Sequence, residues 1–178
     1  SIANTIKFFA KAGLDFEPGT QQKYSGIAAF DVLAKIIENI TKTDYLHFLQ
    51  QEIFEPCEMV NTTFIPTHEQ WKQIIAMHNK IDGNNSVAKM KENCIFYDYP
   101  CMHYLGGAGL VSTLDDYSKF AKMLLNKGKT PKKQILSEET FRLLHTPFVS
   151  EEIMPSNERW GLGVRVIVRE AYKTLPVG

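Results

Sequence analysis

The sequence predicts an α+β fold in a single partial domain, with a helical region over about residues 1–150 and the start of an antiparallel sheet at about 158–170. Apolar residues recur with a period near 3.6 and follow capping residues in the first region, as in amphipathic helices. In the second region they alternate and are often β-branched, as in a strand. With 178 residues, 44% of them hydrophobic, the chain is long enough to bury a sizeable core.

Composition excludes several function classes. Twenty basic residues balance twenty acidic ones, so nothing attracts the chain to nucleic acid or to an anionic membrane surface. No run approaches the roughly 20 apolar residues that span a bilayer. The five histidines and the cysteines at 57, 94 and 101 fit no zinc spacing, so no metal or cofactor is expected. Buried or free thiols are favoured over a disulfide between Cys94 and Cys101.

The first elements flank a turn. A helix over 2–12 is expected to end at Gly13, and Pro18-Gly19 then forms a turn that leads to Tyr24 at the start of the next helix. The apolar residues of that second helix share one face, which we expect to be buried: Ile27, Phe30, Leu33, Ile36, Ile37 and Ile40.

Four further segments follow with different patterns. Thr41 and Asp44 have the spacing of a capping box, which predicts a helix over about 44–54. An extended edge is expected at 62–64 and another helix at about 68–80. The Gly- and Asn-rich stretch over 80–99 is expected to be a long surface excursion.

The second half of the chain opens on closely spaced glycines over 106–109. They lack the lysine and hydroxyl residue of a phosphate-binding loop, so they indicate close packing. Thr113 then caps a helix that carries Asp115 and Asp116 as helix-start charges. We expect its apolar stripe to be buried: Leu114, Tyr117, Phe120, Ala121, Leu124 and Leu125. Ser137 caps a helix that ends near 144, and 160–168 is predicted to be one strand.

Several motifs of this sequence occur together in one known family. They are Glu17-Pro18-Gly19-Thr20, Tyr24-Ser25, Ile53-Phe54-Glu55-Pro56, Gly106-Gly107-Ala108-Gly109-Leu110-Val111-Ser112-Thr113 and Gly161-Leu162-Gly163. In this register the chain resembles the serine β-lactamase and penicillin-binding protein family, in its class C β-lactamase, esterase and D-aminopeptidase branch. The resemblance implies a β-lactamase/transpeptidase-like fold, of which the chain would hold mainly the helical region and the first strand of the sheet.

That family works with three motifs: a Ser-x-x-Lys with the nucleophile, a tyrosine motif, and a Lys-Thr-Gly, His-x-Gly or Trp-x-Gly strand. Only the second is visible here, as Tyr24-Ser25-Gly26. The resemblance implies that Tyr24 is catalytic, as a proton shuttle, and that Ser25 and Gly26 bind substrate. We therefore expect the chain to be the middle of a larger hydrolase, with the first motif upstream and the third after Gly178, and to be inactive by itself.

The chemistry depends on Tyr24. A serine hydroxyl is a weak nucleophile until a base takes its proton. A tyrosine, with an ordinary pKa of about 10, can do so only if cations lower that pKa or a lysine relays the proton. From residue type alone, a tyrosine before a helix is more often a packing residue, and only the family resemblance favours catalysis.

Two departures from the family pattern leave the activity open. Gly26 stands where an asparagine would offer its amide to a β-lactam, which favours an ester or a D-amino acid peptide as substrate. Glu58 stands where a glycine is usual, so its backbone is expected either to take a positive φ or to form a different turn. Both departures are also consistent with an alternative function, a non-catalytic binding domain of the same fold.

Two segments match the sequences of the first and third family motifs in whole or in part. Ser86-Val87-Ala88-Lys89 matches Ser-x-x-Lys but follows Tyr24 and has no apolar stripe to bury it. Lys173-Thr174-Leu175 has a leucine where substrate must approach a glycine. We therefore reject both as catalytic motifs.

The resemblance also implies partners and a location. The substrate would be a small molecule or a peptidoglycan-like peptide, and the protein would act outside the cytoplasm or in the cell envelope. If the rest of the sheet is missing from this chain, the apolar surface left exposed would favour self-association.

Overall fold

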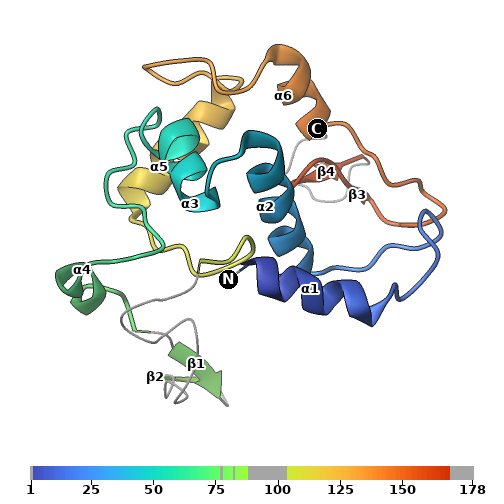
Figure 1. The fold of residues 1–178 in the computed structure, drawn as a ribbon, viewed down its shortest axis with the longest axis horizontal. Coiled ribbons are helices and arrows are strands. Elements are labelled where there is room, and N and C mark those ends of the chain that lie inside the picture. The colour runs from blue at the N-terminus through green and yellow to red at the C-terminus, as the bar shows by residue number, and fades with distance from the viewer. Residues whose placement is uncertain (1, 77, 82, 88–103, 169–178) are drawn as a thin grey trace.

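The computed structural model describes residues 2–76, 78–81, 83–87 and 104–168 (Figure 1). Its elements, in chain order, are α1 (Ile2–Ala12), α2 (Ala28–Thr41), α3 (Tyr45–Leu49), the π-helical turn η1 (Gln50–Phe54), α4 (His68–Lys72), β1 (His78–Ile81), β2 (Asn84–Val87), α5 (Leu114–Leu125), α6 (Glu138–Leu144), β3 (Glu158–Trp160) and β4 (Arg165–Ile167). Helices therefore dominate, and the strands form two separate antiparallel hairpins.

The first two helices lie against each other, and α1 has the predicted bounds, with Gly13 at a positive φ of 76° just after its end (Figure 1). The predicted burial of the apolar face of α2 is wrong. Its buried residues are Asp31 and Ala34, whereas Leu33 is 53% exposed and Ile40 75% exposed. A period of 3.6 shows that apolar residues share a face, but the described structure covers that face only in part.

The segment after α2 forms a continuous helical run, α3 and η1, over the predicted range. The predicted capping box is wrong, because the cap is Asp44, whose side chain accepts hydrogen bonds from the backbone N–H groups of Leu46 and His47. A few residues beyond η1, Glu58 has a φ of 59°. Of the two backbone alternatives left open at this position, the structure has the positive φ.

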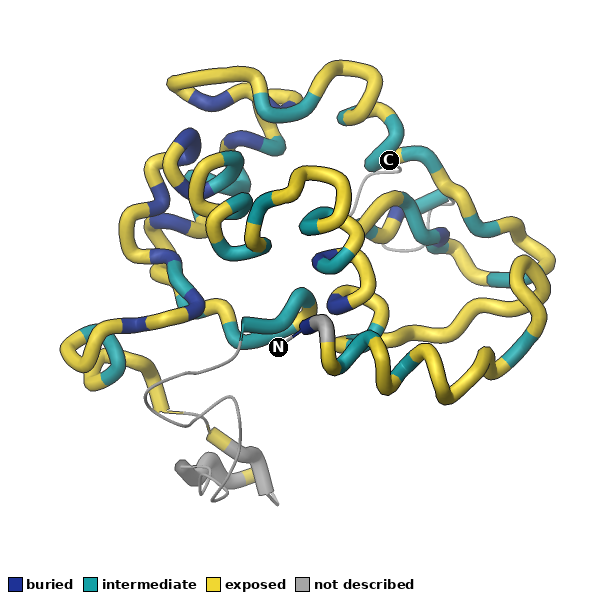
Figure 2. The backbone as a smooth tube through the Cα atoms, in the orientation of Figure 1, coloured by how far each residue is buried: buried dark blue, intermediate teal, exposed yellow. Residues whose placement is uncertain are grey.

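The described core lies between η1 and α5. Phe54, Cys57, Met59 and Met123 form its buried cluster. Figure 2 shows that buried stretches are short and that most of the described backbone is exposed or intermediate. The predicted buried stripe of α5 is wrong in part, because Leu114, Tyr117 and Leu125 are exposed. The side of α5 that faces the core carries Asp116 and Met123, which are buried and lie outside the predicted stripe. Phe120 and Leu124 of the stripe also pack on the core and are partly buried.

Asp116 fastens α5 to the extended segment near residue 62. Its carboxylate accepts hydrogen bonds from the Asn61 N–H at 2.6 Å, the Thr62 hydroxyl at 3.0 Å and the Lys119 ammonium at 3.1 Å. Although it is in the first turn of α5, this side chain is a buried structural anchor and not only a helix-start charge. Beside it, Thr63 and Val111 form an antiparallel bridge, which is what remains of the predicted extended edge.

The predicted helix over 68–80 is also wrong in extent. Thr67 and Gln70 form a capping box, but α4 ends at Lys72. Residues 78–81 form β1, which pairs with β2 in a hairpin. Ser86 lies in β2, opposite Asn79, so this serine is on a strand, and the lysine that follows it in sequence lies outside the described residues.

The C-terminal elements follow α6, which is capped by Ser137 as predicted. The single strand predicted over 160–168 is wrong. The chain turns at 161–164, where the Gly161 N–H donates to the Val164 carbonyl, and β3 pairs with β4. Gly161 also touches α6, since a Cβ there would lie 2.2 Å from the Leu144 carbonyl oxygen. The hairpin is therefore held closely against α6.

Candidate functional site

Tyr24 lies on the loop that enters α2, and its side chain is 70% exposed. The ring stacks on Trp160 of β3, with ring centroids 6.3 Å apart and an angle of 20° between the planes. Offset stacking of this kind restrains both the position and the tilt of a ring. The phenol is thus held against a strand while it remains open to solvent.

Trp160 is itself held by its neighbours. Its indole N–H donates to the side-chain oxygen of Gln22 at 3.2 Å, although the two residues are 138 positions apart. The Arg165 guanidinium lies 5.1 Å from the centre of a Trp160 ring, a cation–π contact across the β3–β4 pair. Gln22 and Tyr24 of one loop therefore both contact one indole of the hairpin.

Two glycines fix the backbone next to Tyr24. A Cβ at Gly107 would lie 2.4 Å from the Gly26 carbonyl oxygen, and one at Gly106 would lie 2.1 Å from the Phe30 carbonyl oxygen. The Gly106 N–H donates to a carboxylate oxygen of Asp31 at 2.7 Å. The glycine stretch therefore packs closely, as the sequence predicts, and the structure shows that its partner is the start of α2.

Two ion pairs lie near this loop. Lys23 and Asp15 form an exposed ion pair at 2.7 Å, whose hydrogen bond raises the pKa of the lysine and lowers that of the aspartate. Arg165 pairs with Glu158 at 3.0 Å. The hydrogen bonds described for these two cations go to the carboxylates, not to Tyr24.

A family profile described as Beta-lactamase matches residues 3–167. The chain belongs to the Beta-lactamase family. Its fold is accordingly the predicted α+β fold of β-lactamases and penicillin-binding proteins, here with its helices and short antiparallel hairpins.

Relatives and solved structures agree with this family. The chain is 26% identical over 159 residues to an N-acetylmuramyl-L-alanine amidase of Bacillus subtilis, a match that covers 83% of this chain and 36% of that protein. It is 26% identical over 121 residues to the D-alanyl-D-alanine-carboxypeptidase/endopeptidase AmpH of Escherichia coli, covering 67% and 27%. The chain thus spans about a third of the length of the curated relatives it matches.

Two solved structures show the same fold. EstCE1, described as a hydrolase with promiscuous acyltransferase activity, superposes with a TM-score of 0.76 at 20% identity, over 99% of this chain and 48% of that one. An octameric penicillin-binding protein homologue from Pyrococcus abyssi gives a TM-score of 0.66 at 20% identity, over 93% and 35%.

Ser25 and Gly26 complete the tyrosine motif of this Beta-lactamase family chain. The Ser25 hydroxyl oxygen accepts a hydrogen bond from the Ala29 N–H at 3.2 Å, so it closes the first turn of α2. A Cβ at Gly26 would lie 3.2 Å from a Tyr24 ring carbon, so any larger residue would press on that ring. Both residues shape the surroundings of Tyr24, and their contact with substrate stays a prediction.

The structure brings together residues that the sequence did not connect. Gln22 and Arg165 carried no motif, and Trp160 was assigned only to a strand. Position along the chain gave no signal that these side chains meet Tyr24. Among the described residues, no group of three His, Cys, Asp or Glu side chains is placed to hold a metal ion, and none of the described helices has the length and apolar character needed to cross a membrane.

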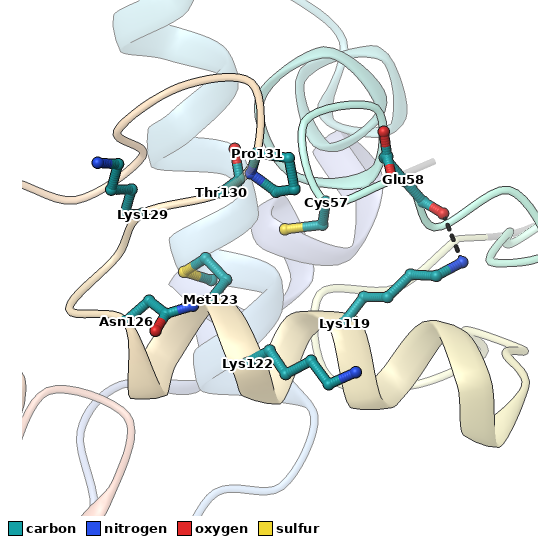
Figure 3. Close-up of a pocket in the computed structure, with 9 residues that line it drawn as sticks. All are labelled: Cys57, Glu58, Lys119, Lys122, Met123, Asn126, Lys129, Thr130 and Pro131. Atoms are coloured by element: carbon teal, nitrogen blue, oxygen red, sulfur yellow. Dashed lines mark hydrogen bonds between the residues drawn. The ribbon is translucent and has the colours of Figure 1, made fainter.

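A separate pocket of about 250 Å³ lies between the end of η1 and α5 (Figure 3). Cys57 and Met123 line it together with Lys119, whose ammonium donates to the Glu58 carbonyl at 2.9 Å. Burial raises the pKa of the Cys57 thiol, which disfavours a reactive thiolate. This pocket lies in the core region. Its lining includes no residue of the tyrosine motif, Tyr24-Ser25-Gly26.

Proposed function

We propose that the protein is a serine hydrolase of the acyl-transfer type, in which Tyr24 moves the proton between nucleophile and leaving group. The supporting observation is the placement of Tyr24: its ring is restrained by Trp160, and its side chain is 70% exposed at the start of α2. A restrained but accessible phenol suits proton transfer to a substrate held in front of it. The serine nucleophile and its lysine belong to a Ser-x-x-Lys motif outside these 178 residues.

The proposed reaction has two halves. The serine oxygen attacks the substrate carbonyl while its proton passes to the Tyr24 oxygen, and Tyr24 then protonates the departing alcohol or amine as the tetrahedral intermediate collapses. Water next attacks the acyl-enzyme, its proton takes the same path, and the acid leaves while the serine regains its proton. Tyr24 can accept a proton only as a phenolate, so we propose that lysines outside this chain lower its pKa.

For the substrate, we propose an ester or a D-amino acid peptide ahead of a β-lactam. Gly26 has no side-chain amide to offer a β-lactam, and the ring of Tyr24 occupies the space beside Gly26. The names of the relatives, an amidase and a D-alanyl-D-alanine carboxypeptidase, support a peptidoglycan-like peptide. Such a substrate implies action outside the cytoplasm or in the cell envelope.

The test uses the full-length protein with a fluorophosphonate and, separately, a fluorescent penicillin, and follows the adduct by intact mass. We expect one covalent adduct on a serine upstream of Tyr24. Tyr24→Phe should slow its formation by about 10²–10⁴-fold, the usual contribution of a general acid–base group. Tyr117→Phe is the matched control, because Tyr117 is also exposed but lies on α5.

The same experiment separates the alternatives. Faster reaction with the fluorophosphonate supports an esterase, and faster reaction with the penicillin supports a penicillin-binding enzyme. If neither probe adds mass to the wild-type protein, the hydrolase proposal is wrong and a non-catalytic binding domain of the same fold replaces it. An adduct that forms equally fast in Tyr24→Phe would remove Tyr24 from the reaction.

A further inference from the structure

We propose that Trp160 is a positioning residue for Tyr24, and that Gln22 sets the orientation of its indole for this purpose. The inference rests on the proposed function, because it assigns to Trp160 a role that acts only through the Tyr24 phenol. It names a residue that lies outside the three motifs of the family and far from Tyr24 in sequence.

The loop that carries Tyr24 has little structure of its own. Residues 13–25 contain no helix or strand, and their described backbone hydrogen bond within the loop closes the turn from Glu17 to Thr20. With its side chain 70% exposed, Tyr24 has few neighbours that could fix its ring. The stacked indole is therefore the main described restraint on where the phenol points.

The Trp160 indole is contacted at two different places. Tyr24 lies over its face, whereas the Gln22 oxygen accepts a hydrogen bond from the N–H at its edge. A stacking contact alone permits the rings to slide, and a hydrogen bond alone permits them to rotate. Together the two contacts fix the loop against the indole in position and in angle.

Trp160 also stands on a rigid support. Its strand β3 pairs with β4, and the Trp160 carbonyl accepts a hydrogen bond from the Phe148 N–H at 2.9 Å. The next residue, Gly161, lies against the Leu144 carbonyl with no room for a side chain. Groups that must be placed to a fraction of an ångström are best held from such supports, since a misplacement of about 1 Å can cost 10²-fold in rate.

The test compares kcat and KM for p-nitrophenyl ester hydrolysis by the full-length protein and its variants. Trp160→Leu removes both contacts and should lower kcat by roughly 30–100-fold with KM within about twofold. Trp160→Phe keeps a ring for stacking and should retain kcat within about fivefold. Gln22→Leu removes only the edge contact and should lower kcat by about fivefold. Trp71→Leu, in α4, is the control for the loss of a tryptophan elsewhere and should leave kcat unchanged.

A double-mutant cycle with Tyr24→Phe decides between positioning and a purely structural role. If Trp160 acts through the phenol, Trp160→Leu should lower kcat by less than about twofold once Tyr24 is already Phe. An equal fold-loss in both backgrounds overturns the proposal. If Trp160→Leu does not fold, as judged by circular dichroism, Gln22→Leu is put through the same cycle with the same two outcomes. The proposed function fails separately, by an unchanged kcat in Tyr24→Phe alone.

Discussion

Two fully buried aspartates lie in different regions of the molecule and differ in how their charges are satisfied. Asp116, on α5, is 0% exposed and accepts hydrogen bonds from Asn61, Thr62 and Lys119. Asp31, on α2, is 1% exposed, and one of its oxygens accepts from the Gly106 N–H. The other Asp31 oxygen has no hydrogen-bond partner among the residues that the structure describes.

The two aspartates differ because one region satisfies its buried groups from within the chain and the other does not. We call the first region self-contained and the second open. Around η1 and α5, the chain supplies a buried apolar cluster and every partner of its buried charge. Around α2, it leaves a charge half satisfied and an apolar face exposed, with Tyr24 at the entry to the same helix. Buried polar groups are almost always paired, so the open region indicates where further contacts belong. The candidate site thus lies in the region where the described residues leave a buried carboxylate oxygen of Asp31 without a hydrogen-bond partner.

The largest expected effect is at Asp116. Asp116→Ala leaves the Asn61 N–H, the Thr62 hydroxyl and the Lys119 ammonium without their acceptor, and should lower the free energy of unfolding by about 3–5 kcal/mol in urea denaturation. Asp31→Ala is the matched control and should cost less, because it deletes one hydrogen bond together with an unsatisfied buried oxygen. Equal losses at the two sites would contradict the comparison.

The environment of Asp116 also predicts that the stability of the fold depends on pH. Burial alone would raise the pKa of its carboxyl, but the hydrogen bonds from Asn61, Lys119 and Thr62 outweigh burial, and the pKa lies below its ordinary value. A lowered pKa in the folded protein stabilises it at pH values above the unfolded pKa of about 4. The contribution should be lost as the pH falls below about 4 through the folded pKa, and Asp116→Asn should remove this part of the acid sensitivity in thermal melts.

A smaller effect is expected where the glycine stretch meets α2. Gly106→Ala would place a Cβ 2.1 Å from the Phe30 carbonyl oxygen, so backbone must move, at a cost of about 2–3 kcal/mol in the free energy of unfolding. Gly163→Ala is the control, because its Cβ meets open space and only its φ of 84° is unfavourable, at about 1 kcal/mol. A Gly106→Ala variant no less stable than Gly163→Ala would show that this contact can relax.

The sequence predicted features whose causes are local. Thr113 and Ser137 cap their helices as expected, because a cap depends on residues three positions apart. The buried face of α2 was predicted wrongly and that of α5 wrongly in part, since periodicity groups apolar residues without showing what covers them. The burial of Asp116 and the meeting of Tyr24 with Trp160 depend on residues far apart in sequence, and no local pattern encodes them.

The smallest expected effect tests whether the self-contained region is also free of strain. Glu58 has a φ of 59°, a conformation in which a Cβ is unfavourable, at a position where the family usually has glycine. Glu58→Gly should therefore raise the free energy of unfolding by about 0.5–1 kcal/mol in urea denaturation, because the Lys119 bond to the backbone carbonyl of residue 58 is kept. Glu58→Ala is the matched control, since it removes the same carboxylate and keeps the Cβ. If the alanine variant gains as much as the glycine variant, the gain comes from the lost carboxylate, and the backbone at this turn is not strained.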